Sequence, residues 1–172
     1  RRAGFTSIKV NTVVRRGTND DQVLPLAAHF RAHYGAGVAL RFIEFMDAGC
    51  HNGWQLGEVV PSALLRERIA AQWPLQPVPP ARGGETAERW AYADGAGEIG
   101  FISSVSQAFC GDCTRARLTA DGRLFTCLFA ARGHDLRGLL RAREGSEAAL
   151  RERLAAIWAE RADAYSEQRE RL

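Results

Sequence analysis

The sequence lacks any long hydrophobic run and contains few cysteine residues. No stretch of about 18 consecutive apolar residues occurs, so we expect no membrane-spanning helix and no membrane partner. The first residues, Arg1 to Thr6, lack the apolar stretch of a secretory signal, which favours the reducing cytoplasm as the compartment. Four cysteines among 172 residues are too few for a disulfide scaffold, so we expect them to be ligands or core residues.

An excess of charge of either sign is also absent. The formal net charge of +3 is too small to indicate a protein that coats nucleic acid, and we expect no nucleic-acid partner. Apolar residues make up 46% and charged residues 25% of the sequence, which is typical of a soluble globular protein. The length suffices for one large domain or two small ones.

Residues 1–60 predict a βαβ unit. Short, β-branched runs at residues 8–14 and 38–46 are typical of strands. Between them, residues 18–21 offer N-cap side chains for a helix that runs to about Tyr34. Such a connection makes the two strands parallel neighbours. One βαβ unit completes neither a sheet nor a barrel, so we expect further strands beside it.

Residues 61–89 predict a helix followed by an extended connector. Pro61 suits the first turn of a helix that runs to about Trp73. Four prolines between residues 74 and 80 then favour an extended, non-helical conformation.

Residues 90–172 predict strands with tight turns and then a C-terminal helix. Asp94-Gly95 and Asp121-Gly122 lie between strand-like runs, as hairpin turns do. Ser146 is a candidate N-cap for the final helix. Its apolar stripe consists of Leu150, Leu154, Ile157, Trp158 and Tyr165. The many Arg and Glu residues after Glu144 indicate a solvated helix face.

Three of the four cysteines follow the spacing C-x2-C-x13-C, at Cys110, Cys113 and Cys127. Three thiolates are one ligand short of a structural zinc site, which Cys50 or His51 would complete. Three thiolates also suit a four-iron cluster whose last iron takes a non-protein ligand. Buried structural thiols and a redox pair are further readings. The spacing by itself does not choose between zinc and iron–sulfur.

The hairpin that carries the third cysteine has two alternative registers. A two-residue Asp121-Gly122 turn pairs Cys127 with Ala116 and points the sulfur away from the other two. A three-residue loop, 120–122, with its glycine left-handed, pairs Cys127 with Arg115 instead. Only the second register gathers the sulfurs and the guanidinium groups on one face, so we predict the three-residue loop.

Arg115 and Arg117 share the strand face of Cys113 if side chains alternate. Guanidinium groups bind phosphates through two parallel hydrogen bonds, so an anionic ligand is the natural partner. Solvated surface ion pairs are the alternative. Their position beside the cysteines favours the anion.

Five segments of the sequence resemble one family closely. They are Ile-Lys-Val-Asn at 8–11, Arg-Gly-x-Asn-Asp at 16–20, Leu-Arg-Phe-Ile-Glu-Phe-Met-Asp at 40–47, Gly-Phe-Ile-Ser-Ser-Val-Ser at 100–106 and Phe-Cys-x-x-Cys-x-Arg-x-Arg-Leu-Thr-Ala-Asp-Gly at 109–122. The family is the GTP 3′,8-cyclase of molybdenum-cofactor biosynthesis, a radical S-adenosylmethionine lyase. The segments occur in order along nearly the whole chain, and the resemblance favours iron–sulfur over zinc.

The resemblance implies an α/β fold in three parts. Residues 1–60 would hold the last βαβ unit, the C-terminal strands of a partial (βα)6 radical-S-adenosylmethionine barrel. Residues 61–89 would be a helix and a Pro-rich connector. Residues 90–172 would form an α+β domain with hairpins and a C-terminal helix that binds a cluster and GTP.

The resemblance also implies roles for individual residues. The ligands of an auxiliary [4Fe–4S] cluster would be Cys110, Cys113 and Cys127. The GTP-binding residues would be Lys9, Arg115, Ala116 and Arg117. S-adenosylmethionine would contact Met46 and Arg41, with Asn11 a weaker candidate near it. Cys50 lies outside the family's motif and is expected to be an incidental thiol.

Two features of the family are missing from the sequence. The C-x3-C-x2-C motif that binds the second [4Fe–4S] cluster, and the tail that ends in Gly-Gly, are not found. We therefore expect a fragment that needs the N-terminal half of the barrel as a partner and shows no turnover alone. The full enzyme would convert GTP to (8S)-3′,8-cyclo-7,8-dihydroguanosine 5′-triphosphate. A homodimer and a related radical enzyme with another substrate remain open.

Overall fold

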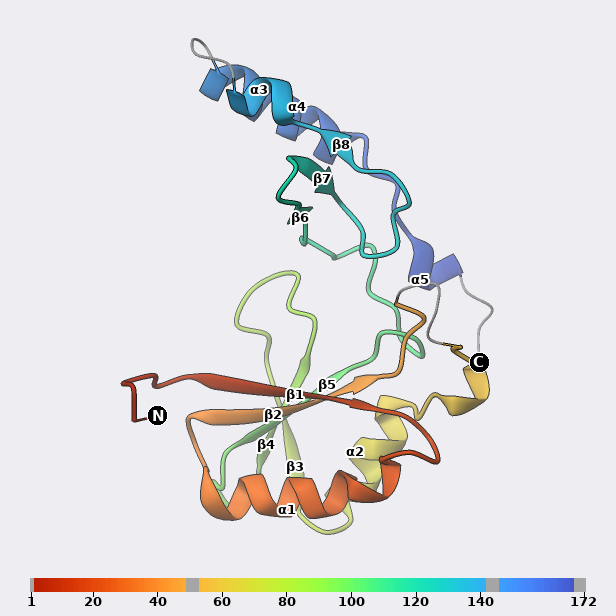
Figure 1. The fold of residues 1–172 in the computed structure, drawn as a ribbon. Coiled ribbons are helices and arrows are strands. Elements are labelled where there is room, and N and C mark those ends of the chain that lie inside the picture. Colours follow the sequence, from red (N-terminus) through yellow and green to blue (C-terminus); the bar gives the residue numbers. More distant parts are fainter. Residues whose placement is uncertain (1, 49–52, 142–145, 169–172) are drawn as a thin grey trace.

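The computed structural model describes residues 2–48, 53–141 and 146–168 (Figure 1). Within these ranges the chain forms a five-stranded mixed sheet, in the order β1-β2-β5-β4-β3, and a three-stranded antiparallel sheet, β6-β7-β8. The mixed α/β class predicted from the sequence is confirmed. None of the described helices is long and apolar enough to cross a bilayer.

The predicted βαβ unit is confirmed. Strand β1 (Ile8–Val14), helix α1 (Val23–His33) and strand β2 (Val38–Glu44) follow one another, and the two strands are parallel neighbours with Ile8 opposite Val38. Strand β2 ends two residues earlier than expected, so Met46 follows the strand. This places Met46 at the carboxyl end of the parallel strands, the end at which open α/β sheets bind their ligands.

The predicted cap of the first helix is wrong. A 3-10 turn, η1 (Asp20–Gln22), precedes α1, and the residue at the N-cap position, Gln22, makes no side-chain cap hydrogen bond. The side chain of Asn19 instead accepts a hydrogen bond from the backbone N–H of Arg15 at 2.9 Å. That of Asp20 accepts one from the N–H of Gly17 at 2.7 Å. The polar side chains close the turn after β1, because such residues satisfy turn backbone as readily as helix ends.

The expected connector at residues 74–80 contains a strand. Strand β3 (Leu75–Val78) pairs antiparallel with β4 (Glu88–Tyr92), at the edge of the sheet. An edge strand tolerates Pro77 because the strand has a neighbour on only one side. On the other side no N–H is needed for the ladder, so the one that proline lacks is not missed. The preceding helix, α2 (Ser62–Ala70), stops three residues before the expected end and follows a short 3-10 turn, η2 (Leu56–Glu58).

The five-stranded sheet crosses the expected part boundaries. Strand β5 (Glu98–Ile102) lies between β2 and β4, parallel to β2 and antiparallel to β4. The β4–β5 connection contains Asp94-Gly95, the expected hairpin position. Helices α1 and α2 lie on one side of the sheet (Figure 1).

The main core lies between that side of the sheet and the two helices. Phe42 of β2 faces Phe101 of β5 in register, and their ring centroids are 6.3 Å apart. The cluster consists of Val14, Val23, Ala27, Leu40, Phe42, Val60, Leu65, Ile69, Tyr92, Ile99 and Phe101. Alternate residues of β1 point to the other side of the sheet, where Lys9 and Asn11 are exposed.

The rest of the chain, which we call the cysteine region, runs from residue 105 to residue 168. Its elements are β6 (Arg117–Leu118), β7 (Arg123–Phe125), β8 (His134–Asp135), α3 (Arg137–Arg141), α4 (Ser146–Ala159) and α5 (Tyr165–Gln168). Its core is a small cluster of Leu124, Leu136 and Ile157, flanked by Leu150 and Leu154.

The C-terminal helix is shorter than predicted. Leu150, Leu154 and Ile157 form the expected stripe, but Trp158 is 39% exposed. Tyr165 lies in the separate helix α5, because residues 161–164 form no helix. This non-helical segment turns toward the cysteines, as described below.

The three-residue hairpin loop is confirmed. Arg117 pairs with Phe125 and Leu118 with Leu124, which leaves residues 120–122 as the loop. The N–H of Thr119 donates to the carbonyl of Arg123 at 2.9 Å, and Gly122 has a left-handed φ of 81°. The ladder ends at the pair Arg117 and Phe125, so Arg115 and Cys127 lie just beyond it, and both line the cavity described below.

Candidate functional site

All three predicted cluster ligands line one cavity, which we call the cysteine cavity. Its lining includes Cys110, Cys113 and Cys127 together with Met46, Arg115, Arg117 and Arg161. These side chains come from the chain after β2, the loop before β6, β6 itself, the connection between β7 and β8, and the segment after α4. The sequence spacing and the hairpin register therefore identified a set of residues that the fold brings together. Ala116 is exposed and does not line this cavity.

The C-x2-C loop forms a tight turn. The N–H of Cys113 donates to the carbonyl of Cys110 at 3.2 Å, which keeps the two cysteines of the pair close together. The guanidinium of Arg115 donates from Nε to the Cys113 sulfur at 3.2 Å and lies over the Phe109 ring at 5.1 Å from its centroid.

The environment of Cys113 favours the thiolate. Burial by itself raises the pKa of this thiol, but hydrogen bonds from the backbone and guanidinium of Arg115, and the charges of Arg115 and Arg161, bring the net pKa below its usual value. The thiolate is the form of cysteine that binds metal, and a lowered pKa makes that form easier to reach. Cys127 accepts a hydrogen bond from the N–H of Phe129 at 3.4 Å.

The donor set suits an iron–sulfur cluster by its chemistry, because cluster irons take thiolate ligands. Three half-buried thiols line the one cavity. Among the residues that the structure describes, no three cysteine, histidine, aspartate or glutamate side chains meet closely enough to hold one metal ion. Cys50 and His51, the zinc alternative, lie outside the described residues.

The cysteine cavity is narrow as it stands. Its volume is about 50 Å³, room for one or two water molecules. The exposed side chains of Arg115 and Arg117 form part of its wall. Long, exposed side chains such as these change rotamer at low cost, so this part of the wall is adjustable.

Two residues of this site were missed by the sequence interpretation. Arg161 donates to the carbonyl of Cys113 at 2.5 Å and to that of Cys110 at 3.5 Å, and it lies over the Trp158 ring. Asp163 accepts a hydrogen bond from the buried hydroxyl of Thr126 at 2.5 Å. Their segment is dense in Arg and Glu, and no local pattern distinguishes these two from solvated neighbours.

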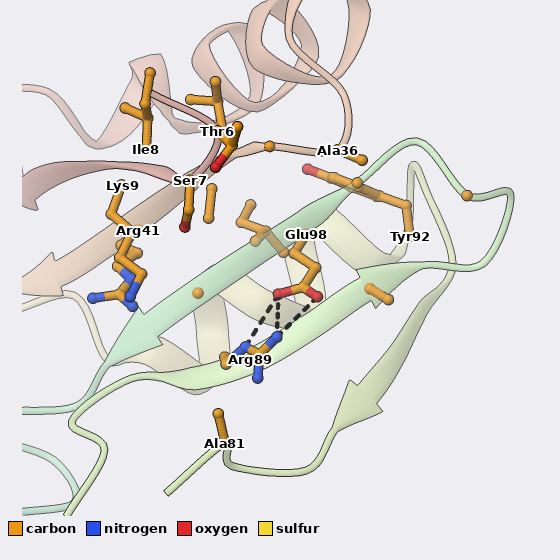
Figure 2. Close-up of a pocket in the computed structure, with 18 of the residues that line it drawn as sticks. Thr6, Ser7, Ile8, Lys9, Ala36, Arg41, Ala81, Arg89, Tyr92 and Glu98 are labelled. Carbon is orange, nitrogen blue, oxygen red and sulfur yellow. Dashed lines mark hydrogen bonds and ion pairs between the residues drawn. The ribbon is translucent and has the colours of Figure 1, made fainter. Parts of the chain in front are cut away.

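A second, larger cavity lies beside the amino-terminal halves of β1, β2 and β5, with a volume of about 590 Å³. It is lined by Lys9 and Arg41, two other predicted ligand-binding residues, which extend from neighbouring strands on one side of it (Figure 2). Arg41 has Glu85 at 3.9 Å, whereas Arg89 and Glu98 form a closer ion pair at 2.8 Å. Lys9 and Arg41 thus line a different cavity from the cysteines.

Glu44 ties the sheet to the chain that leads into the cysteine loop. Its carboxylate is fully buried at the end of β2. It accepts backbone N–H donors from Ser62 at 2.7 Å and from Val105 and Ser106 at 2.8 Å each. The Ser106 hydroxyl donates to it at 2.5 Å. This carboxylate fixes where residues 105–106 leave the sheet, next to Met46.

Comparisons with known proteins agree on one family. The sequence profile described as Molybdenum Cofactor Synthesis C matches residues 38–167. The chain is 56% identical over 168 residues to the GTP 3′,8-cyclase of Xanthomonas campestris pv. campestris (strain B100), covering 97% of this chain and 48% of that protein. It is 52% identical over 170 residues to the GTP 3′,8-cyclase of Acidothermus cellulolyticus, covering 97% and 46%. The chain spans about half the length of the curated relatives it matches.

Proposed function

Because this chain belongs to the Molybdenum Cofactor Synthesis C family, we propose that it forms the part of a GTP 3′,8-cyclase that binds the auxiliary cluster and GTP. The observation that carries the proposal is the shared cavity of three cysteines and two arginines. Thiolates bind iron, and guanidinium groups bind phosphates, so the lining of this cavity suits both a cluster and a nucleotide.

Cys110, Cys113 and Cys127 would hold a [4Fe–4S] cluster. When bound, the cluster supplies an iron with an open coordination position for the purine of GTP. Arg115 and Arg117 would bind the triphosphate, with backbone from Ala116. Lys9, which lines the larger cavity, would bind GTP from β1 at a separate point. Their task is to orient the nucleotide, and no residue of this chain need act as an acid or a base.

The parallel strands β1, β2 and β5 would be the C-terminal strands of a partial (βα)6 barrel. Three features support this assignment: the strands are parallel, both helices cover one side, and β1 lies at the edge of the sheet within the described residues. Barrel strands from the rest of the enzyme would add beside β1. Met46 and Arg41 would then contact S-adenosylmethionine, and the reaction would begin with radical attack on the GTP ribose and end with a bond to the base.

Metal analysis tests the cluster. After anaerobic purification and reconstitution with iron and sulfide, we expect close to four irons per chain and a visible charge-transfer band. Cys110→Ala, Cys113→Ala and Cys127→Ala should each lose most of the iron, because each removes one of three thiolates. Stoichiometric zinc without iron, in the wild-type chain, would refute the cluster and favour a zinc-stapled binding module.

Calorimetry with GTP tests the arginines. The double variant Arg115→Ala, Arg117→Ala should weaken GTP binding by at least about a hundredfold, because charge-assisted hydrogen bonds to phosphate contribute about 1.5–3 kcal/mol each. The matched control is Arg151→Ala with Arg153→Ala, two exposed arginines on α4. Equal GTP affinity in both double variants would indicate a different substrate.

A further inference from the structure

The segment between α4 and α5 touches every part of the chain that carries a predicted cluster ligand. We call residues 161–167 the strap. It begins after α4 and ends within α5, which lies beside the chain between β5 and β6 (Figure 1). The strap makes three separate sets of contacts, all polar or aromatic.

The first set fastens the C-x2-C loop from two sides. The guanidinium of Arg161 donates to the carbonyls of both Cys110 and Cys113. The carboxylate of Glu167 accepts the N–H of Gly111, between the two cysteines, at 3.1 Å. A loop held at both cysteine carbonyls and at the amide between them keeps its two sulfurs at a fixed spacing.

The second set fastens the segment of Cys127. Asp163 accepts the hydroxyl of Thr126, a residue only 5% exposed, at 2.5 Å. The Tyr165 ring stacks on that of Phe129, with centroids 4.3 Å apart and planes 16° from parallel. The residues one before and two after Cys127 are therefore both held by the strap.

The third contact reaches the sheet. The Tyr165 hydroxyl donates to the carboxylate of Asp47 at 2.7 Å, and Asp47 directly follows Met46. The same tyrosine thus links the strap to the Cys127 segment and to the carboxyl end of β2.

Arg161 also brings a positive charge to the cysteine cavity. Its side chain is 11% exposed and lines the cavity, with Asp163 at 3.5 Å from its Nε. A fixed cation beside an iron–sulfur cluster stabilises the reduced form, because reduction adds negative charge.

We propose that residues 161–167 hold the three cysteine segments in the arrangement that receives the cluster, with Arg161 as a positioning residue whose charge also makes the bound cluster easier to reduce. The second half of this statement rests on the proposed cluster, and the first half does not. The two halves are therefore tested separately.

Hydrogen exchange in the metal-free chain tests the strap. Arg161→Gln removes both bonds to the cysteine carbonyls and should speed amide exchange at residues 111–114 by about tenfold, while exchange in β1 and β2 stays unchanged. The control Arg151→Gln alters an arginine of α4 whose side chain is 78% exposed and should change neither region. Equal exchange rates in the two variants would refute the proposal that the strap holds the cysteine loop.

A second variant separates position from charge. Arg161→Lys keeps the charge but lacks the fork that reaches two carbonyls, so its loop should exchange faster than that of the wild type. In the reconstituted chain, a redox titration should give Arg161→Gln a lower midpoint potential than wild type, with Arg161→Lys close to wild type. An unchanged midpoint potential in Arg161→Gln would refute the role of the charge. It would not affect the proposal that the strap holds the cysteine segments.

The outcomes also separate this inference from the proposed function. A wild-type chain that binds zinc or no metal would refute the cluster and the role of the charge with it, yet the exchange experiment would still decide on the strap. Full cluster binding combined with unchanged loop exchange in Arg161→Gln would refute the strap and leave the proposed function intact.

Discussion

Within the described residues, the sheet of β1 to β5 buries eleven apolar side chains in one cluster, whereas the cysteine region buries three. The ladder between β1 and β2 has seven residue pairs, and that between β6 and β7 has two. Buried apolar area is the main source of folding free energy, so apolar burial stabilises the sheet region more than the cysteine region. The cysteine region depends more on directed polar contacts, as small units with little core generally do.

The largest effect is expected from the core of the sheet region. Leu65→Ala empties a fully buried position on α2 and should lower the free energy of unfolding by about 2–5 kcal/mol. Leu64→Ala, on the same helix but 40% exposed, should change it by about 0.5 kcal/mol or less. Urea denaturation of both variants measures the difference. Similar losses in the two variants would break the comparison, because burial would not then explain the stability of this region.

The carboxylate that joins the two regions should give an intermediate effect. Glu44→Gln leaves one acceptor oxygen where two oxygens now receive three backbone N–H groups and a hydroxyl. The new amide N–H₂ would face donors, so we expect a loss of about 1–3 kcal/mol. Exchange of the amides of Val105 and Ser106 should also quicken.

Ser106→Ala is the milder partner of that variant. It deletes one donor to the same carboxylate and should cost about 1 kcal/mol. Thermal unfolding ranks the two variants. A Glu44→Gln chain as stable as the wild type, with unchanged exchange at residues 105–106, would mean that this carboxylate does not fasten the two regions.

The smallest effect is the share of the pH dependence of stability that comes from Asp94 in the sheet region. The pKa values of Asp121 and Asp135 in the cysteine region are also lowered by hydrogen bonds and nearby arginines. A hydrogen bond from Arg31 lowers the pKa of Asp94 to about 2, from a usual value near 4. A carboxyl group with a lowered pKa in the folded state adds stability that is present above pH 4 and is lost as the pH falls from about 4 to about 2. Asp94 lies at the surface, so the contribution is small.

Two variants test this dependence through the same ion pair. Asp94→Asn should flatten that stretch of the stability profile, measured by urea denaturation at a series of pH values. Arg31→Gln should flatten the same stretch, because it removes the cause of the lowered pKa. A profile that keeps its slope in both variants would show that another group titrates there.

The sequence predicted best where one local pattern dominates. Short, β-branched runs located β1 and β2, and the parallel pairing followed from the connection through a helix. The hairpin loop at 120–122 followed from a choice between two registers, only one of which places the sulfurs and the guanidinium groups on the same face. Cysteine spacing likewise grouped three residues that the fold places around one cavity.

The sequence predicted poorly where the outcome depends on contacts that the local pattern does not contain. Asn19 is a good helix cap by type, yet its side chain accepts a hydrogen bond from Arg15 in the turn after β1. Pro77 argues against a strand, yet the edge position makes its missing N–H harmless. Arg161 contacts residues 48 and 51 positions away, a pairing that no local pattern encodes.

The guanidinium of Arg161 lies 5.1 Å from the centre of the Trp158 ring. Trp158 is the one tryptophan of the four that follows the cysteines in the sequence, so its fluorescence reports on this end of the chain. A chain in which Trp54, Trp73 and Trp90 are replaced by Phe would emit from this indole alone. Departure of the cation would leave the ring in water, and a shift of its emission to longer wavelength would record the event in real time.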